Sequence, residues 1–69
     1  MYKKMRLLYK MVVTKCTELY SLDDITSEET AILDDYLDTA EVLLETANQN
    51  SLILLTNEVE KSEVKIEKQ

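Results

Sequence analysis

The sequence contains no glycine and no proline among its 69 residues. These two residues are the strongest helix breakers, and the tight turns of β-hairpins need glycine or asparagine at positive φ. No Asn-Gly or Asp-Gly pair occurs in the chain. Turns between helices can instead be made with aspartate, serine and asparagine. The composition therefore predicts an all-α fold whose helices are joined by polar segments.

Histidine is also absent, and cysteine occurs once. This inventory excludes histidine-containing zinc sites, Ser-His-Asp triads and the glycine-rich loops that bind phosphate. A single thiol cannot form an intrachain disulfide and is typical of a reducing cytoplasm. We therefore expect no metal and no cofactor, and the leading prediction is a cytoplasmic protein without catalytic activity.

The length allows one small helical domain, spanning residues 1–69. The core of so short a chain supplies only ~3–5 kcal/mol, and natural proteins of this size usually gain stability from disulfides, a metal or a partner. Because the first two are excluded by composition, a partner remains. We expect either a homo-oligomer or a complex with another protein.

Amphipathic periodicity predicts helices at about residues 2–20, 27–48 and 52–64, followed by a frayed tail at 65–69. The apolar stripe of the first consists of Met1, Met5, Leu8, Val12, Cys16 and Leu19. That of the second consists of Leu33, Leu37, Ala40, Leu44 and Ala47, flanked by Ile32, Tyr36 and Leu43. The position of Cys16 on this stripe predicts a buried, unreactive thiol.

The predicted boundaries between the helices differ in strength. Thr26 and Glu29 have the spacing of a capping box, so the second helix should begin near Ser27. The polar cluster at 48–51 is a weaker break, and one continuous helix through residue 60 stays open. The alternation at Val64 and Ile66 also leaves a strand open at the end of the chain.

The net charge of −6 is unevenly distributed along the chain. Residues 1–17 carry five basic side chains and no acid, whereas residues 18–45 carry ten acids and no base. The six residues at 21–26 make an antiparallel hairpin the simplest arrangement of the first two helices. We therefore expect the basic helix to lie beside the acidic one. The third segment, or a second copy, must cover the apolar surface that two helices leave open.

Two groups of residues are candidate partner-binding sites. The acidic stripe of the second predicted helix consists of Asp34, Asp38, Glu41 and Glu45. It is interpreted either as a solvated face opposite the lysines of the first helix or as a docking face for a basic partner. Leu7 and Met11 are one turn apart on the first helix and outside its main stripe. They are either scattered surface residues or part of an interface.

We expect neither nucleic acid nor a membrane as the partner. No apolar run reaches the ~18 residues of a membrane span, and no signal-peptide core follows the basic start. Tyr2 and Tyr9 lie among lysines, as in surfaces that stack on nucleic acid. The chain is acidic overall, however, and the tyrosines are expected on the flank of the core.

The segment Thr30-Ala31-Ile32-Leu33-Asp34-Asp35-Tyr36-Leu37 resembles the signature of the small sporulation-regulating aspartyl-phosphate phosphatases of Gram-positive bacteria. Members of that family are short helical hairpins with a Ser-x-x-x-Asp motif, usually Ser-Gln-x-Leu-Asp, and an aliphatic residue three positions later. The positions that match are Leu33, Asp34 and Leu37, together with Arg6 for an arginine often found early in the first helix.

The resemblance covers roughly residues 5–40, and this sequence departs from the family pattern inside the motif. Thr30 stands at the serine position and Ala31 at the glutamine position. The resemblance implies that Asp34 and Thr30 would act on a response regulator. Asp34 would reach into the phosphorylation site and assist the attack of water on the aspartyl phosphate, by positioning and electrostatics.

Three functions therefore stand as hypotheses. The leading one is a small non-enzymatic regulatory protein that binds a protein partner through its helical faces. The first alternative is a phosphatase-type regulator that dephosphorylates a response regulator. The second is a purely structural homo-oligomer.

Overall fold

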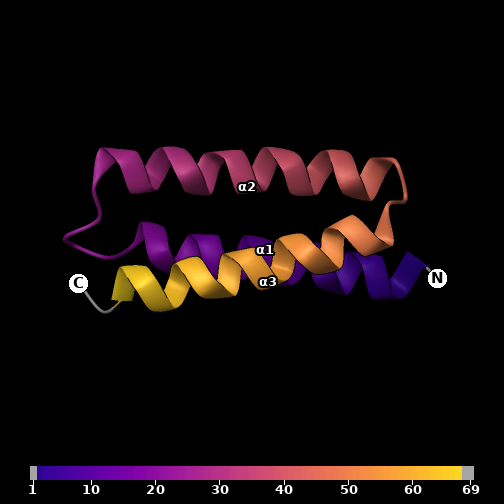
Figure 1. Ribbon diagram of the computed structural model, residues 1–69, viewed down its shortest axis with the longest axis horizontal. Coiled ribbons are helices and arrows are strands. Elements are labelled where there is room, and N and C mark those ends of the chain that lie inside the picture. Colours follow the sequence, from indigo (N-terminus) through magenta and orange to yellow (C-terminus); the bar gives the residue numbers. More distant parts are fainter. Residues whose placement is uncertain (1, 68–69) are drawn as a thin grey trace.

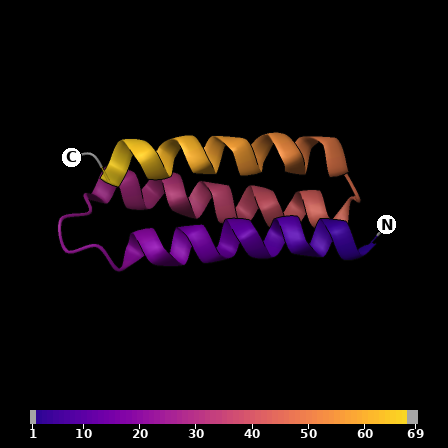
Figure 2. The ribbon, with the colours of Figure 1, turned by 90° about the horizontal axis from the view of Figure 1, so that it is seen from below.

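The computed structural model describes residues 2–67, which form three α-helices: α1 (Tyr2–Tyr20), α2 (Ser27–Glu45) and α3 (Gln49–Glu67). All three are 19 residues long. α1 and α3 run in the same direction and α2 runs antiparallel to both (Figures 1 and 2). The predicted all-α fold and the predicted antiparallel hairpin of the first two helices are confirmed.

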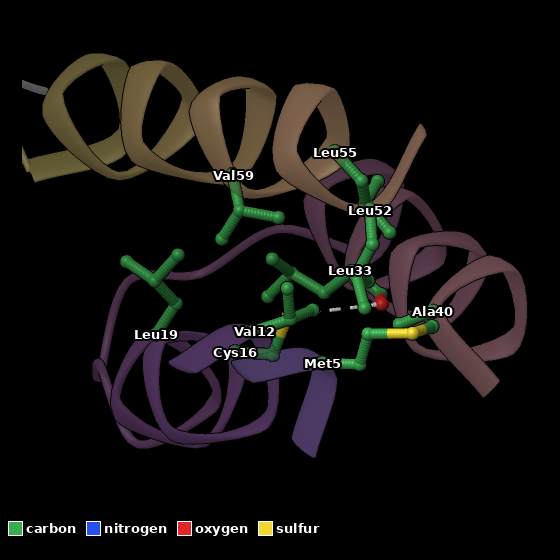
Figure 3. Close-up of a cluster of buried hydrophobic side chains, with 9 residues drawn as sticks. All are labelled: Met5, Val12, Cys16, Leu19, Leu33, Ala40, Leu52, Leu55 and Val59. Carbon is green, nitrogen blue, oxygen red and sulfur yellow. Dashed lines mark hydrogen bonds between the residues drawn. The ribbon is translucent and has the colours of Figure 1, made fainter. Parts of the chain in front are cut away.

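The core lies on the common axis of the three helices (Figure 3). The buried apolar residues are Met5, Val12, Cys16 and Leu19 from α1, Leu33 and Ala40 from α2, and Leu52, Leu55 and Val59 from α3. Those of each helix follow its apolar stripe, so each helix turns one face inward. The seam left open by α1 and α2 is covered by α3. Dimerisation is therefore not needed to bury that seam, and it stays a prediction.

The start of α2 is fixed by a capping box, as the sequence predicted. The Glu29 N–H donates to the Thr26 hydroxyl oxygen at 3.1 Å, and the Thr26 N–H donates to Glu29 Oε1 at 2.9 Å. Glu28 and Glu29 also place negative charge at the positive end of the helix dipole. These local interactions set the first residue of α2 independently of the rest of the fold.

The end of α2 differs from the prediction, because the helix stops at Glu45 rather than near residue 48. The Asn48 N–H donates to the Leu43 carbonyl at 2.9 Å, and the Ala47 N–H donates to the Leu44 carbonyl at 3.2 Å. Ala47 has a φ of 56°. This is a Schellman motif with alanine at the left-handed position where glycine is usual.

The third helix is longer than the predicted 52–64. Asn48 begins it by accepting the Ser51 N–H on its side chain at 3.2 Å and the Leu52 N–H on its carbonyl at 3.1 Å. A continuous helix through residue 60 is thereby excluded. Val64 and Ile66 are helical, so the strand interpretation was wrong. The helix includes residues 65–67 of the predicted frayed tail, and residues 68–69 lie outside the described part.

Each pair of helices is joined by a polar contact between side chains. Tyr20 on α1 donates to Asp34 on α2, Lys15 on α1 forms a 3.0 Å ion pair with Glu63 on α3, and the hydroxyls of Tyr36 and Ser62 join α2 to α3 at 2.7 Å. The expected pairing of the basic and acidic helices is not found for Lys15, whose partner lies on α3. Over residues 2–67, Lys3, Lys4 and Lys10 also make no ion pair with an acid of α2.

The alanine at the left-handed position generates a stability prediction. An L-residue there costs roughly 1–2 kcal/mol, and part of the gain from glycine is lost through the entropy of the unfolded chain. We expect Ala47→Gly to raise the free energy of unfolding by about 1 kcal/mol, measured by urea denaturation and far-UV circular dichroism.

The matched control is Ala31→Gly, which places glycine on the exposed surface of α2. It should lower the free energy of unfolding by about 1 kcal/mol, because glycine is unfavourable inside a helix. A loss of stability in both variants would contradict the role assigned to Ala47.

Candidate functional site

The four acids of the predicted stripe lie on one side of α2, and all are exposed. Their spacings of four, three and four residues keep them within one face of the helix. Asp34 accepts a hydrogen bond from the phenol of Tyr20, whereas Asp38, Glu41 and Glu45 form no ion pair within residues 2–67. The stripe is thus an exposed anionic surface in which one carboxylate is held by a neighbouring helix.

The Tyr20–Asp34 contact changes the acidity of the phenol. Burial raises the pKa of Tyr20, and the hydrogen bond to Asp34 and its negative charge raise that pKa further. Asp34 itself stays exposed, so its second carboxylate oxygen can face an incoming molecule. Sequence reasoning missed this contact because it depends on how the loop at 21–26 aligns the two helices.

Thr30 lies one turn before Asp34 on α2. Its hydroxyl donates to the Thr26 carbonyl at 3.0 Å, and the side chain is half-buried. The structure thus places Thr30 and Asp34 on neighbouring turns of one helix. Arg6, which shares the family resemblance, is exposed on α1.

The second predicted site lies on α1. Leu7 and Met11 are 61% and 41% exposed, and with Lys10, Thr14 and Lys15 they line a shallow groove of about 230 Å³. We call these five residues the α1 groove. Its two large apolar side chains remain accessible although α3 packs beside α1.

The acidic stripe on α2 and the α1 groove border opposite flanks of α1 and do not form one surface. Tyr20 reaches α2, whereas Lys15, which follows Leu7 and Met11 along the same stripe, reaches α3. Tyr20 is five positions after Lys15, so the two side chains point about 140° apart around the helix axis. A single small partner segment therefore contacts one site or the other.

Other large apolar side chains are exposed that sequence reasoning did not place in a site. Val42 is 56% exposed beside the acids of α2, and Leu54 is 64% exposed on α3. Ile32 was expected on the flank of the core but is 48% exposed. It lines a groove of about 360 Å³ between α2 and α3 together with Tyr36, Ser62 and Ile66. The 3.6-residue period places Val42 outside the central apolar stripe of α2, and this position could have predicted its exposure.

Cys16 and the tyrosines that pack against the core have structural roles. Burial raises the pKa of the Cys16 thiol, and the charge of Asp34 raises it further. The predicted buried thiol is thus confirmed. Tyr9, Tyr20 and Tyr36 pack against the core, as expected for its flank. In the described range 2–67, no three Cys, Asp or Glu side chains are placed to hold a metal ion.

Comparisons with known proteins identify no relative of this chain. No family model matches the chain, and no curated protein or solved structure is significantly similar to it. Among residues 2–67, none of the helices has the length and apolar character needed to cross a membrane.

The raised pKa of Tyr20 generates a pH prediction. The unfolded chain loses the phenol proton near pH ~10, whereas the folded protein retains it to higher pH. The folded state therefore binds more protons above pH ~10, and its stability must fall as the pH rises through this range. We expect the decline between about pH 8 and about pH 11 to be shallower for Tyr20→Phe, measured by urea denaturation.

Asp34→Asn should lower the pKa of Tyr20 toward its ordinary value, as followed by NMR titration of the tyrosine ring. Asp35→Asn removes an adjacent exposed carboxylate and is the matched control. Equal shifts in the two variants would show that general charge, rather than the Tyr20–Asp34 contact, sets the acidity of this phenol.

Proposed function

We propose that this chain is a small non-enzymatic regulatory protein that binds a protein partner through its outer helical faces. The observation that supports it best is the α1 groove, in which Leu7 and Met11 stay accessible while nine other apolar side chains of the described residues 2–67 are buried. Full burial of a leucine or methionine side chain yields about 1.5–3 kcal/mol. Burial of the exposed parts of these two side chains by a partner would therefore favour binding at the groove.

The acidic stripe of α2 supports the same proposal by a different effect. Exposed charges add little to the affinity of a complex, but they steer the approach of an oppositely charged partner and disfavour the wrong ones. Asp38, Glu41 and Glu45 are exposed on one face of α2, so their charges can act together on an approaching partner. We assign the affinity to the α1 groove and the charge selectivity to the stripe.

The proposal places this activity in the cytoplasm, because the single thiol is buried and unpaired rather than part of a disulfide. It includes self-association as a separate property, since exposed Val42 and Leu54 offer apolar surface on α2 and α3.

Affinity capture tests the proposal. The immobilised chain should retain a specific protein from a lysate of the source cells, and Leu7→Ala/Met11→Ala should reduce that retention at least tenfold, because two side chains worth about 1.5–3 kcal/mol each are truncated. Leu54→Ala truncates an equally exposed residue on α3 and should leave retention unchanged. Quantitative mass spectrometry supplies the readout. Retention that is the same for both variants, or no retained protein, would refute the proposal.

A second candidate is the phosphatase-type regulator, which is favoured by the fixed position of Asp34. An exposed carboxylate held by Tyr20 can orient a water molecule for attack on an aspartyl phosphate of a response regulator. In that reaction a bond forms between the water oxygen and phosphorus. The bond from phosphorus to the carboxyl oxygen breaks, which restores the carboxylate of the regulator's aspartate and releases inorganic phosphate.

The assay for this candidate measures loss of phosphate from phosphorylated response regulators of the source organism. Asp34→Asn should reduce the rate at least tenfold, because a positioned general base typically contributes 10²–10⁴-fold. Asp35→Asn, one residue away and equally exposed, should retain the rate. If the wild-type chain leaves every phosphorylated regulator intact, this second candidate is wrong and the first is unaffected.

A further inference from the structure

We infer that the α1 groove binds an acidic amphipathic helix of the partner protein. This inference rests on the proposed function, because it specifies the chemical class of the segment that the groove takes. The shape of the groove and the charges around it favour such a helix over a second copy of the chain or an anionic membrane.

The shape of the groove fits the side chains of a helix. Leu7 and Met11 are four residues apart, which places them about 6 Å apart along the axis of α1. Thr14 lies one turn further along and extends the same surface. A helix laid across this surface can contact both apolar residues with two apolar side chains of its own at i and i+4, as in other helix-in-groove complexes.

The charges around Leu7 are all positive within α1. Lys3 and Lys4 precede Leu7 by four and three residues, and Lys10 follows it by three, so these lysines surround it on the helix surface. All three are exposed and form no ion pair within the described residues. A partner helix that contacts Leu7 is therefore expected to place acids at this end.

The opposite end of the groove is electrically different. Lys15 is paired with Glu63 of α3, and the charges of Glu18 and Glu60 also act on it. The positive charge available to a partner is thus concentrated at the Leu7 end. This asymmetry gives the bound helix a direction, with its acidic residues toward Lys3, Lys4 and Lys10.

A second copy of this chain does not fit the groove. Its acidic helix α2 turns Leu33 and Ala40 into the core, and its large exposed apolar residues are Ile32 and Val42. These two are ten residues apart, or about 15 Å along the axis, and cannot both meet side chains that are about 6 Å apart. The large exposed apolar residues of α3, Leu54 and Val64, are also ten residues apart. The acidic helix is therefore expected from a different protein.

An anionic membrane surface fits less well than a protein. Helices that lie in a membrane interface bury a continuous apolar face. The apolar face of α1 is occupied, because Met5, Val12 and Leu19 are in the core. Leu7 and Met11 alone remain for insertion from the groove, and the chain carries a net charge of −6, which repels an anionic surface.

The test uses two designed helical peptides of about 16 residues, long enough to form a helix. Both carry leucine at two positions four apart, and one has glutamates around them where the other has lysines. Fluorescence anisotropy should show the glutamate peptide binding the wild-type chain at least tenfold more tightly than the lysine peptide, a difference of about 1.4 kcal/mol. The preference should weaken as salt rises.

Charge reversal at Lys3→Glu/Lys10→Glu should abolish that tenfold preference. The matched control, Lys61→Glu/Lys65→Glu, makes the same change in net charge on α3 and should retain it. Leu7→Ala/Met11→Ala should weaken both peptides equally. Equal binding of the two peptides by the wild-type chain, or equal effects of the two charge reversals, would overturn the inference.

The same experiment also tests the two other occupants, an anionic membrane and a second copy of the chain. Binding to phosphatidylserine vesicles that competes with the glutamate peptide, or self-association lost in Leu7→Ala/Met11→Ala by sedimentation, would also overturn it. The outcome is distinguishable from that of the proposed function. A captured protein whose retention needs Leu7 and Met11 but tolerates Lys3→Glu/Lys10→Glu would uphold the function and refute the acidic helix.

Discussion

The packing of α3 against the seam between α1 and α2 is the constraint on which the rest of the structure depends. Two amphipathic helices can cover only part of each other's apolar stripe, and the third supplies Leu52, Leu55 and Val59 to close the core. Once this core is closed, the inward face of each helix is buried. Only the outer faces of the bundle remain for contact with other molecules, which is why the candidate sites lie along helices and not in a cleft.

The polar contacts between helices add a preference for one alignment of the bundle. Tyr20–Asp34, Lys15–Glu63 and Tyr36–Ser62 lie in the half of the molecule that contains the loop between α1 and α2. The Tyr20–Asp34 contact is exposed and the other two are partly buried, so the core supplies the stability while the contacts favour one register. Leu7 and the lysines around it lie in the other half, toward the start of α1.

The features that could be predicted from the sequence are those fixed within one or two helical turns. The capping box at Thr26, the exposure of the acids from Asp34 to Glu45 and the burial of Cys16 all follow from spacing along a single helix. The Schellman motif at Ala47 could not be predicted, because its usual glycine signal is missing. The pairing of Lys15 with Glu63 was also missed. Blocks of charge indicated α2 as the partner, but the direction of a side chain around its helix decides which neighbour it meets.

The same distinction explains why the fold is easier to derive than the function. A buried position is determined by the chain itself, since each apolar face must meet another face of the same molecule. An exposed pair such as Leu7 and Met11 meets no other face of the chain, so the sequence defines only one side of any contact that the pair makes. The position of the exposed pair and the charges around it indicate part of the chemistry expected on the other side. An apolar pair surrounded by lysines favours a segment with apolar residues and acids, which is the occupant that we propose for the α1 groove.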